Sequence, residues 1–286
     1  MVLPLTRPIF IIGCGRSGTT LLGSAMAQHR AVAYLNEPRQ LWAQSIPSSD
    51  IWSAGSVGHR GKIALDRLDC PPGAAQSLRG AFETVLARSG RQRFCEKLPI
   101  NAFRLPLLDH IFPDALYLYL ERDGIAVARS IAKRAETGPW FGAGDRKWLL
   151  LTELAERDAT LGALARACVS GFHRGLLEWV LSSLWARRFL AAVPGRTITV
   201  RYDELVDAPA ATADRIERFC DLPRTGEISI YLAGTARHNP LPSPATPPDT
   251  LAMDLLARRS ALMPPAEDEA AMAEVGLPAK SPSSLK

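Results

Sequence analysis

A short apolar run leads directly into a glycine-rich loop, Gly-Cys-Gly-Arg-Ser-Gly-Thr-Thr, at residues 13–20. A strand, a glycine turn and the start of a helix direct backbone N–H groups and the positive end of the helix at an anion. In nucleotide hydrolases such a loop carries Lys directly after its second defining glycine. Gly13 and Gly18 have that spacing, but Thr19 stands in the place of the lysine. The loop therefore predicts an anion site and argues against cleavage of ATP or GTP.

A second strand–helix junction places an arginine and a hydroxyl on converging elements. The apolar run 115–121 is followed by Arg122, and Ser130 lies two turns into the predicted helix that comes next. Asp123 is suited to cap that helix. An arginine and a hydroxyl that converge in this way suit a phosphate monoester. The alternative is that Arg122 only forms an ion pair with a neighbouring carboxylate, Glu121 or Asp123.

The composition is that of an ordinary globular protein with a sizeable core. The chain has 286 residues, of which 47% are hydrophobic and 22% charged, and its net charge is +5. This positive charge suits an anionic ligand but is too small to indicate a nucleic-acid partner. The five cysteines form no Cys-x-x-Cys pair, which favours a reduced, cytoplasmic protein. No signal peptide or apolar run long enough to span a membrane is recognisable, so we expect no membrane span.

Short apolar runs alternate with longer helical patterns along the chain. This alternation predicts an α/β fold, and the glycine-rich loop makes it P-loop-like, so we expect one such domain over 1–286. A central, mostly parallel sheet of about five strands should be flanked by helices. The predicted strands are 8–12, 31–35, 92–96, 115–121 and 196–201. The predicted helices are 18–29, 74–89, 101–111, 124–135, most of 152–191, 207–220 and 250–263.

Two irregular segments, 45–73 and 136–148, interrupt these patterns. Loops over the carboxyl ends of parallel strands usually shape a ligand site, so we predict that both contact the substrate. Residues 223–286 are predicted to form a C-terminal lid or tail, with a proline-rich linker over 239–249.

These motifs resemble those of sulfotransferases that use 3′-phosphoadenosine 5′-phosphosulfate (PAPS), in particular the bacterial, cytosolic type. The resemblance covers about residues 8–222 and rests first on the loop and on Arg122 with Ser130 eight residues later. Two weaker matches are Arg201-Tyr202-Asp203-Glu204-Leu205 and Glu96-Lys97-Leu98-Pro99. The late loop that closes over the coenzyme in the phenol-type branch has only a poor counterpart around Arg237.

The resemblance implies a set of donor-binding residues. The loop would hold the 5′-phosphosulfate, Arg122 and Ser130 would grip the 3′-phosphate, and Tyr202 would lie near the adenine. The loop residues implied are Arg16, Ser17, Gly18, Thr19, Thr20 and Leu21. A sulfuryl group carries less negative charge than a γ-phosphoryl group, so fixed cations and N–H donors suffice and no metal is expected.

Three side chains are implied in catalysis. Arg16 would stabilise the charge that develops on the leaving phosphate. Glu37 would be the general base that takes the acceptor proton, the alternative being that it only pairs with Arg39 or ends the strand. Lys97 would contact the bridging oxygen and the acceptor, the alternative being a surface lysine paired with Glu96. His59 is a weaker rival for the base.

The leading function is therefore transfer of a sulfuryl group from PAPS to a hydroxyl or amine of a small-molecule or saccharide acceptor. A small-molecule kinase on the related fold is the alternative enzyme, and a non-catalytic nucleotide-binding domain is a third class. Neither the acceptor nor the oligomeric state, including a homodimer, follows from the sequence. Aromatic residues Trp140, Phe141 and Trp148 favour an apolar or ring-bearing acceptor. A basic pocket of Arg39, Arg60 and Lys62 would instead favour an anionic saccharide.

Overall fold

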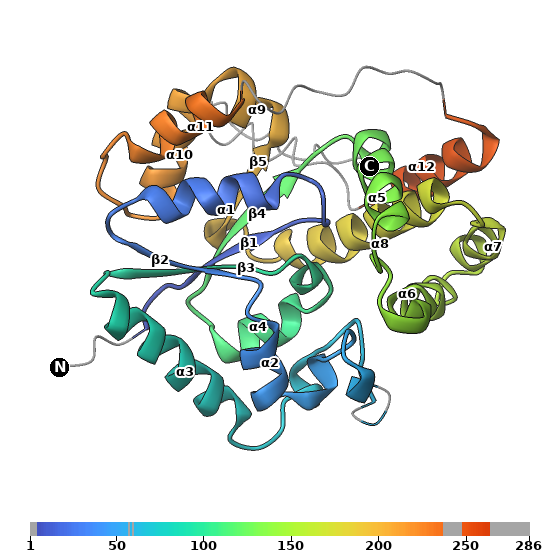
Figure 1. Ribbon diagram of the computed structural model, residues 1–286, viewed down its shortest axis with the longest axis horizontal. Helices are drawn as coiled ribbons and strands as arrows, with labels where there is room; N and C mark the ends of the chain where they lie inside the picture. The colour runs from blue at the N-terminus through green and yellow to red at the C-terminus, as the bar shows by residue number, and fades with distance from the viewer. Residues whose placement is uncertain (1–4, 57, 59, 237–247, 264–286) are drawn as a thin grey trace, which may run out of the picture.

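The computed structural model describes residues 5–56, 58, 60–236 and 248–263. Five strands form one sheet in the order β2-β3-β1-β4-β5, and every described pair of neighbours is parallel (Figure 1). The strands are β1 (Ile9–Ile12), β2 (Val32–Asn36), β3 (Arg93–Lys97), β4 (Leu116–Glu121) and β5 (Thr197–Arg201). All five predicted strands and the α/β fold class are thus confirmed, with ends that differ by no more than a residue.

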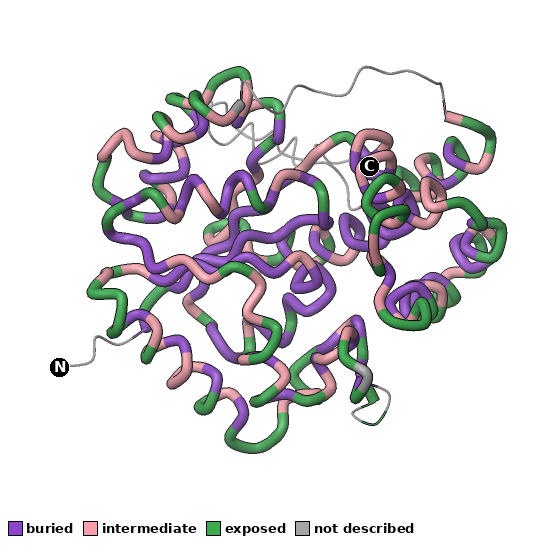
Figure 2. The backbone as a smooth tube through the Cα atoms, in the orientation of Figure 1, coloured by how far each residue is buried: buried purple, intermediate pink, exposed green. Residues whose placement is uncertain are grey.

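The central strands β1, β3 and β4 are buried on both faces, as expected for parallel strands covered by helices (Figure 2). Successive residues of β1 belong to different cores, because side chains alternate between the two faces of a strand. Ile9 and Ile11 pack in the core formed with helices α1, α10 and α11, whereas Phe10 and Ile12 pack in the core formed with α3, α4 and α8. These helices are α1 (Thr19–Gln28), α3 (Ala74–Ser89), α4 (Leu105–Ile111), α8 (Gly171–Leu190), α10 (Pro209–Phe219) and α11 (Glu227–Ala236).

The helical stretch predicted over 152–191 is three helices. They are α6 (Arg146–Ala155), α7 (Ala159–Ala167) and α8. Asp158 caps α7 by accepting a hydrogen bond from the Leu161 N–H, and Ser170 caps α8 by accepting one from the His173 N–H. Each cap satisfies a backbone donor that a new helix start leaves free, so the chain can turn at both places.

Other predicted helices differ in their bounds. Residues 101–111 overlap a 3₁₀ segment, Pro99–Phe103, that precedes α4. The predicted helix 207–220 is α10, and a short helix that was not predicted, α9 (Tyr202–Asp207), precedes it. Helices α5 (Gly124–Glu136) and α12 (Thr250–Leu262) lie where they were predicted, and α2 (Arg39–Ser45) starts ahead of the irregular 45–73 segment. Helix α11 was missed within the segment treated as a lid or tail.

Within the described residues, no helix combines the length and apolar character that crossing a membrane requires. The same part of the chain holds no group of three or more His, Cys, Asp or Glu side chains arranged to bind a metal ion.

Candidate active site

The register of the sheet brings the predicted site residues to one edge. Lys97 at the end of β3 is level with Asn36 of β2 and with Ile11 of β1. The loop that follows β1, Glu37 after β2 and Arg122 after β4 therefore leave the sheet at the same carboxyl edge. This edge is where open α/β sheets bind their ligands.

The glycine-rich loop turns closely against its neighbours at Gly18. Its φ of 100° lies in the left-handed region, and a Cβ built there would come within 2.5 Å of the Tyr202 ring. Tyr202 begins α9 and is itself buried. This close approach explains why residue 18 is a glycine. It also places Tyr202, and with it the motif of residues 201–205, beside the glycine-rich loop.

Replacing Gly18 by Ala is expected to destabilise the protein, since it combines an unfavourable φ with a clash against a buried ring. The expected loss is about 1–3 kcal/mol, which should lower the Tm by several degrees. Gly80→Ala is the matched control, because Gly80 lies in α3 with open space around a built Cβ and should cost nothing. Equal Tm values for the two variants would contradict this account of the loop.

One hollow of about 300 Å³ lies over the loop and the ends of β4 and β5. Its lining is Arg16, Gly18, Thr19, Thr20, Leu21, Ser24, Arg122, Ser130, Tyr202, Tyr231 and Thr235. Among the loop residues assigned from the sequence, Ser17 is buried and does not line the hollow. Tyr231 and Thr235 come from α11, which is how the missed helix enters the site. We call this space the donor hollow.

Arg16 contacts both Ser130 and Arg122 in the donor hollow. Arg16 Nε donates to Ser130 Oγ at 3.1 Å, and Arg122 Nη1 donates to the Arg16 carbonyl at 3.2 Å. The Arg122 guanidinium also stacks over the Tyr202 ring at 3.9 Å. Two arginines, a hydroxyl and a tyrosine thus form one wall that suits an anion.

Arg122 does not pair with either of its neighbouring carboxylates in the described structure. Glu121 accepts from Arg187 at 2.6 Å and from Arg259 of α12 at 3.2 Å, and Asp123 caps α5 by accepting from the Ala126 N–H. Buried Arg122 Nε has no hydrogen-bond partner among the described residues. The ion-pair alternative is therefore wrong, and a donor remains for a ligand.

Electrostatics also favour an anion beside Arg122. Burial lowers the pKa of Arg122, the nearby Tyr202 and Asp203 raise it, and the positive charge of Arg16 lowers it further. An anion placed between the two guanidinium groups would relieve their repulsion.

Lys97 joins the donor hollow to Glu37. Its Nζ donates to Thr20 Oγ1 at 3.2 Å and to Glu37 Oε1 at 2.8 Å, and only 1% of its side chain is exposed. The alternative of a surface lysine paired with Glu96 is therefore wrong. Glu37 also accepts from Arg39 Nη2 at 2.5 Å, so the pairing with Arg39 occurs together with the contact to Lys97.

The carboxyl of Glu37 is held in its ionised form. Burial alone would raise its pKa, but the hydrogen bond and charge of Lys97, together with Arg39, outweigh burial and lower the pKa below its usual value. An ionised carboxylate can accept a proton, so Glu37 has the charge state that the predicted general base requires.

Glu96 has a supporting role beneath the site. It is fully buried and its Oε1 accepts from Trp42 Nε1 and from Asn101 Nδ2, each at 3.0 Å. Burial raises the pKa of Glu96 to about 8, although these hydrogen bonds and Arg104 lower it in part. The side chain ties β3 to α2 and to the segment after Lys97.

Stability should therefore fall as the pH rises from about 5 to about 8. In this window the folded chain holds the Glu96 proton and the unfolded chain has released it, so ionisation favours unfolding. Glu96→Gln should reduce this fall by about 3–4 kcal/mol, because the amide stays neutral and its oxygen can accept the same hydrogen bonds. Denaturant unfolding at both pH values measures the effect. Exposed Glu136→Gln should keep the wild-type pH dependence, and a Glu96→Gln curve that matched wild type would refute the assignment.

A second hollow, of about 390 Å³, lies on the other side of the loop and reaches Glu37. Its lining is Cys14, Gly15, Glu37, Arg39, Trp52, Leu98, Pro99, Ile100, Phe103, Arg134, Pro139, Trp140, Lys147, Glu178 and Ser182. Both irregular segments predicted to contact substrate contribute to it, through Trp52 on one side and through Pro139, Trp140 and Lys147 on the other. We call this space the acceptor hollow.

Glu178 is the chief residue of this hollow that sequence reasoning missed. It is a buried carboxylate on α8 that accepts from Lys147 Nζ at 2.5 Å and from Trp140 Nε1 at 2.9 Å. Trp140 packs so closely on the loop that a Cβ at Gly15 would lie 2.7 Å from its ring. A lone acid within the apolar pattern of residues 175–186 was the available signal.

Several acceptor residues suggested by the sequence lie elsewhere. Phe141 and Trp148 are buried and pack on each other at 5.8 Å, so only Trp140 of the three aromatic residues lines the hollow. Of the predicted basic pocket only Arg39 lines it, and Lys62 pairs with Asp69 at 2.5 Å. His59 and Arg237 lie outside the described residues.

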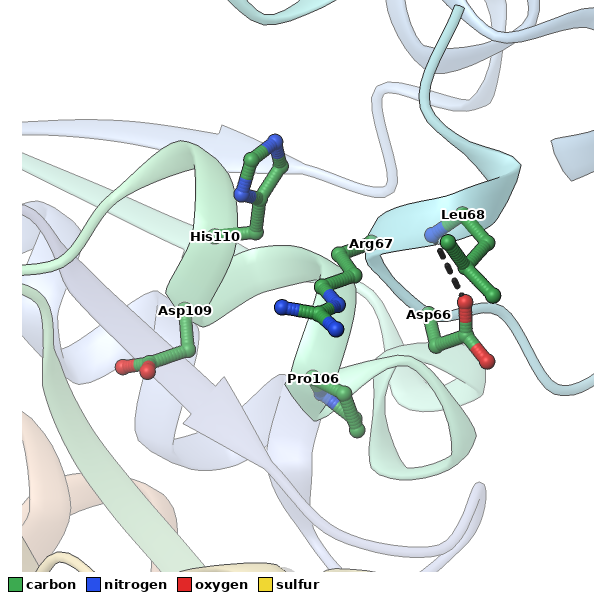
Figure 3. Close-up of a pocket in the computed structure, with 6 residues that line it drawn as sticks. All are labelled: Asp66, Arg67, Leu68, Pro106, Asp109 and His110. Carbon is green, nitrogen blue, oxygen red and sulfur yellow. Dashed lines mark hydrogen bonds between the residues drawn. The ribbon is translucent and has the colours of Figure 1, made fainter.

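A further hollow lies away from this edge. Figure 3 shows it between the 3₁₀ segment Arg67–Asp69 and α4, with Arg67, Asp109 and His110 around it. It shares no lining residue with either hollow at the carboxyl edge of the sheet. It has no part in the site.

A parallel α/β sheet with an anion loop and a paired arginine and serine defines a nucleotide-type anion-binding protein. The comparisons narrow this class. A model of the sulfotransferase family matches residues 8–226, and the chain belongs to this family.

Among curated relatives, the chain is 24% identical over 220 residues to a putative protein-tyrosine sulfotransferase of Caenorhabditis briggsae. That match covers 75% of this chain and 65% of the relative. It is 26% identical to protein-tyrosine sulfotransferase A of Caenorhabditis elegans, covering 75% of this chain and 50% of that one. The chain spans between about a quarter and two thirds of the length of the relatives it matches first.

Solved structures share the fold at low sequence identity. Sulfotransferase STF9 from Mycobacterium avium superposes with a TM-score of 0.53 at 17% identity, covering 96% of this chain and 76% of that one. The sulfotransferase domain from the curacin biosynthetic pathway superposes with a TM-score of 0.52 at 16% identity. That match covers 91% of this chain and 99% of the domain. At such low sequence identity, these structural similarities support only the assignment of the fold.

Proposed function

We propose that the protein is a sulfotransferase that transfers a sulfuryl group from PAPS to a hydroxyl or amine of a small-molecule or saccharide acceptor. One observation carries the proposal. Buried Lys97 contacts Thr20 of the donor hollow and Glu37 of the acceptor hollow at the same time. An in-line transfer between two substrates needs such a cation and a base at the junction of their sites.

The donor hollow fits the nucleotide that the family implies. The unpartnered Arg122 Nε and the Ser130 hydroxyl suit a 3′-phosphate, and the loop with Arg16 suits the 5′-phosphosulfate. Tyr202 and Tyr231 offer aromatic surface for an adenine. When bound, PAPS supplies the sulfuryl group.

The chain's own residues then have distinct tasks. Glu37 accepts the proton of the acceptor hydroxyl, because it is ionised and lines the acceptor hollow. Lys97 and Arg16, with the loop N–H groups, stabilise negative charge on the donor side. Trp140 and Glu178 form the wall of the acceptor hollow beside Gly15, which limits where an acceptor can lie.

Calorimetry with adenosine 3′,5′-bisphosphate, the product form of the donor, tests this proposal. We expect binding in the micromolar range without magnesium, and much weaker binding of ATP under the same conditions. Absence of binding at millimolar nucleotide would refute a PAPS-dependent enzyme. Magnesium-dependent ATP turnover would instead support the kinase alternative, and binding without transfer to any acceptor would support a non-catalytic domain.

We also propose a cytoplasmic location. All five cysteines are free, four of them buried, as is usual in a reducing compartment. Fractionation of the native cell tests it, and recovery of the protein outside the cytoplasm would contradict it.

A further inference from the structure

Both carboxylates of the acceptor hollow are already matched by cations. Lys147 and Trp140 occupy the two oxygens of Glu178, and the Lys147 ammonium also lies 4.5 Å from the centre of the Trp140 ring. On the other side, Lys97 and Arg39 occupy the two oxygens of Glu37. Neither carboxylate is thus left to bind a cationic group of an acceptor.

The hollow carries an excess of positive charge. Its lining has three cations and two carboxylates, and buried Lys97, which is bonded to Glu37 of the lining, adds a fourth cation, so the balance is two positive charges. Lys97 faces the junction with the donor hollow, where it contacts Thr20. The cation that remains without a carboxylate partner among the described residues is Arg134. It lies in the last turn of α5, whereas Arg122 directly precedes the start of that helix.

Arg134 is held in place without an acidic partner. Its Nη1 donates to Thr137 Oγ1 at 3.1 Å, and a Cβ at Gly138 would come within 2.7 Å of the same nitrogen. Because Gly138 has no side chain, the guanidinium of Arg134 can lie in this space. No carboxylate among the described residues lies within 4.0 Å of Arg134. A guanidinium with free donors at the rim of a binding hollow recognises carboxylate, sulfate or phosphate oxygens.

The rest of the lining is largely apolar and aromatic. Trp52, Phe103 and Trp140 contribute rings, and Leu98, Pro99, Ile100 and Pro139 contribute aliphatic surface. The Arg39 guanidinium stacks on Trp52 at 4.3 Å. A hollow of about 390 Å³ with such walls suits the body of a small ring-bearing molecule.

From this charge pattern we infer the acceptor class: a small, ring-bearing hydroxyl compound with one anionic group, which Arg134 binds while the hydroxyl lies at Glu37. This inference rests on the proposed function and adds the identity of the acceptor. It excludes cationic amines as preferred acceptors. It also assigns Arg134 a role in the choice of acceptor. Arg134 takes no part in binding the donor.

Three phenols of similar size that carry a negative, neutral or positive side chain on the same ring test the acceptor class: 4-hydroxyphenylacetate, its neutral amide and tyramine. Binding of each is measured by ligand-observed NMR and by calorimetry in the presence of adenosine 3′,5′-bisphosphate, and transfer is measured with labelled PAPS. We expect the carboxylate to bind about tenfold more tightly than the amide and tyramine to bind most weakly. Equal affinities, or preference for tyramine, would overturn the inference.

Arg134→Gln and Lys133→Gln form a matched pair of variants. Both remove one exposed positive charge from α5, but only Arg134 lines the hollow. Arg134→Gln should reduce the preference for the carboxylate to below about twofold, and Lys133→Gln should preserve it. A preference that survives Arg134→Gln would refute the role of this residue. Because binding is measured separately from transfer, a charge preference without any transfer would contradict the proposed function and leave the ligand class standing.

Discussion

Replacing Glu37 by Gln is expected to lower kcat by a factor of about 10²–10³ while affinity for adenosine 3′,5′-bisphosphate stays within about twofold. The amide keeps the size of the side chain and can accept from Lys97, but it cannot take a proton. Initial rates with labelled PAPS measure kcat, and calorimetry measures nucleotide affinity. Glu153→Gln, at an exposed position of α6, is the control and should match wild type.

The acidity of the acceptor separates a base from a residue that merely positions Lys97. A weakly acidic alcohol needs a base to lose its proton, whereas a nitrophenol is already partly ionised at neutral pH. The defect of Glu37→Gln should therefore shrink markedly with nitrophenol acceptors. A defect of the same size with every acceptor would show that Glu37 acts only through its 2.8 Å contact with Lys97.

The pH dependence gives a second check on Glu37. Because Lys97 and Arg39 hold its pKa below the usual value, its protonation should reduce the rate only at acidic pH below that value. Between pH 6 and pH 8 this group should contribute no change in kcat. A rate that rises with pH through neutrality would require another group as the base.

The sequence predicts the sheet well because each strand is a short apolar run that ends at a chemically distinct residue. The run at 9–12 ends at the glycine loop, and the run at 116–121 ends at Arg122. Such junctions place the glycine-rich loop and Arg122 at one edge of the sheet, whereas the roles of Arg16, Glu37 and Lys97 followed from the resemblance to sulfotransferases. Their mutual contacts depend on register, which only the structure provides.

The acceptor hollow was harder to predict because its walls come from segments without regular patterns. Glu178 sits on an otherwise apolar helix, and its meaning depends on Lys147 and Trp140, which lie more than thirty residues earlier. Trp148 was expected in a loop, but it lies in the first turn of α6 and packs inward against Phe141. Tertiary packing, rather than local pattern, decides which aromatic side chain faces the ligand.

In the donor hollow, too, some lining residues could be predicted from the sequence and others could not. Tyr231 and Thr235 line it from α11, a short helix that packs on α1 and α10. The apolar residues Ile228, Ile230 and Leu232 of this helix recur at every second position, so they give no clear helical period in the sequence. Its position follows from the core that it completes.

Arg122→Ala should weaken binding of adenosine 3′,5′-bisphosphate about a hundredfold, because the guanidinium is the chief cation left for a 3′-phosphate. It has a buried Nε without a partner in the described residues, and both neighbouring carboxylates are engaged elsewhere. A charge-assisted, bidentate contact of this kind accounts for about 3 kcal/mol. Calorimetry on wild type and variant measures the change.

Adenosine 5′-monophosphate makes the prediction for Arg122 specific, since it lacks the 3′-phosphate. Wild type should prefer the bisphosphate strongly, and Arg122→Ala should lose that preference while binding the monophosphate about as well as wild type. Arg122→Lys should fall between the two, because it keeps the charge but not the planar fork. Arg88→Ala, which removes an exposed charge from the last turn of α3, should retain wild-type affinities. If Arg122→Ala weakened both nucleotides equally, Arg122 would support the fold of the hollow through its stacking on Tyr202 rather than bind the 3′-phosphate.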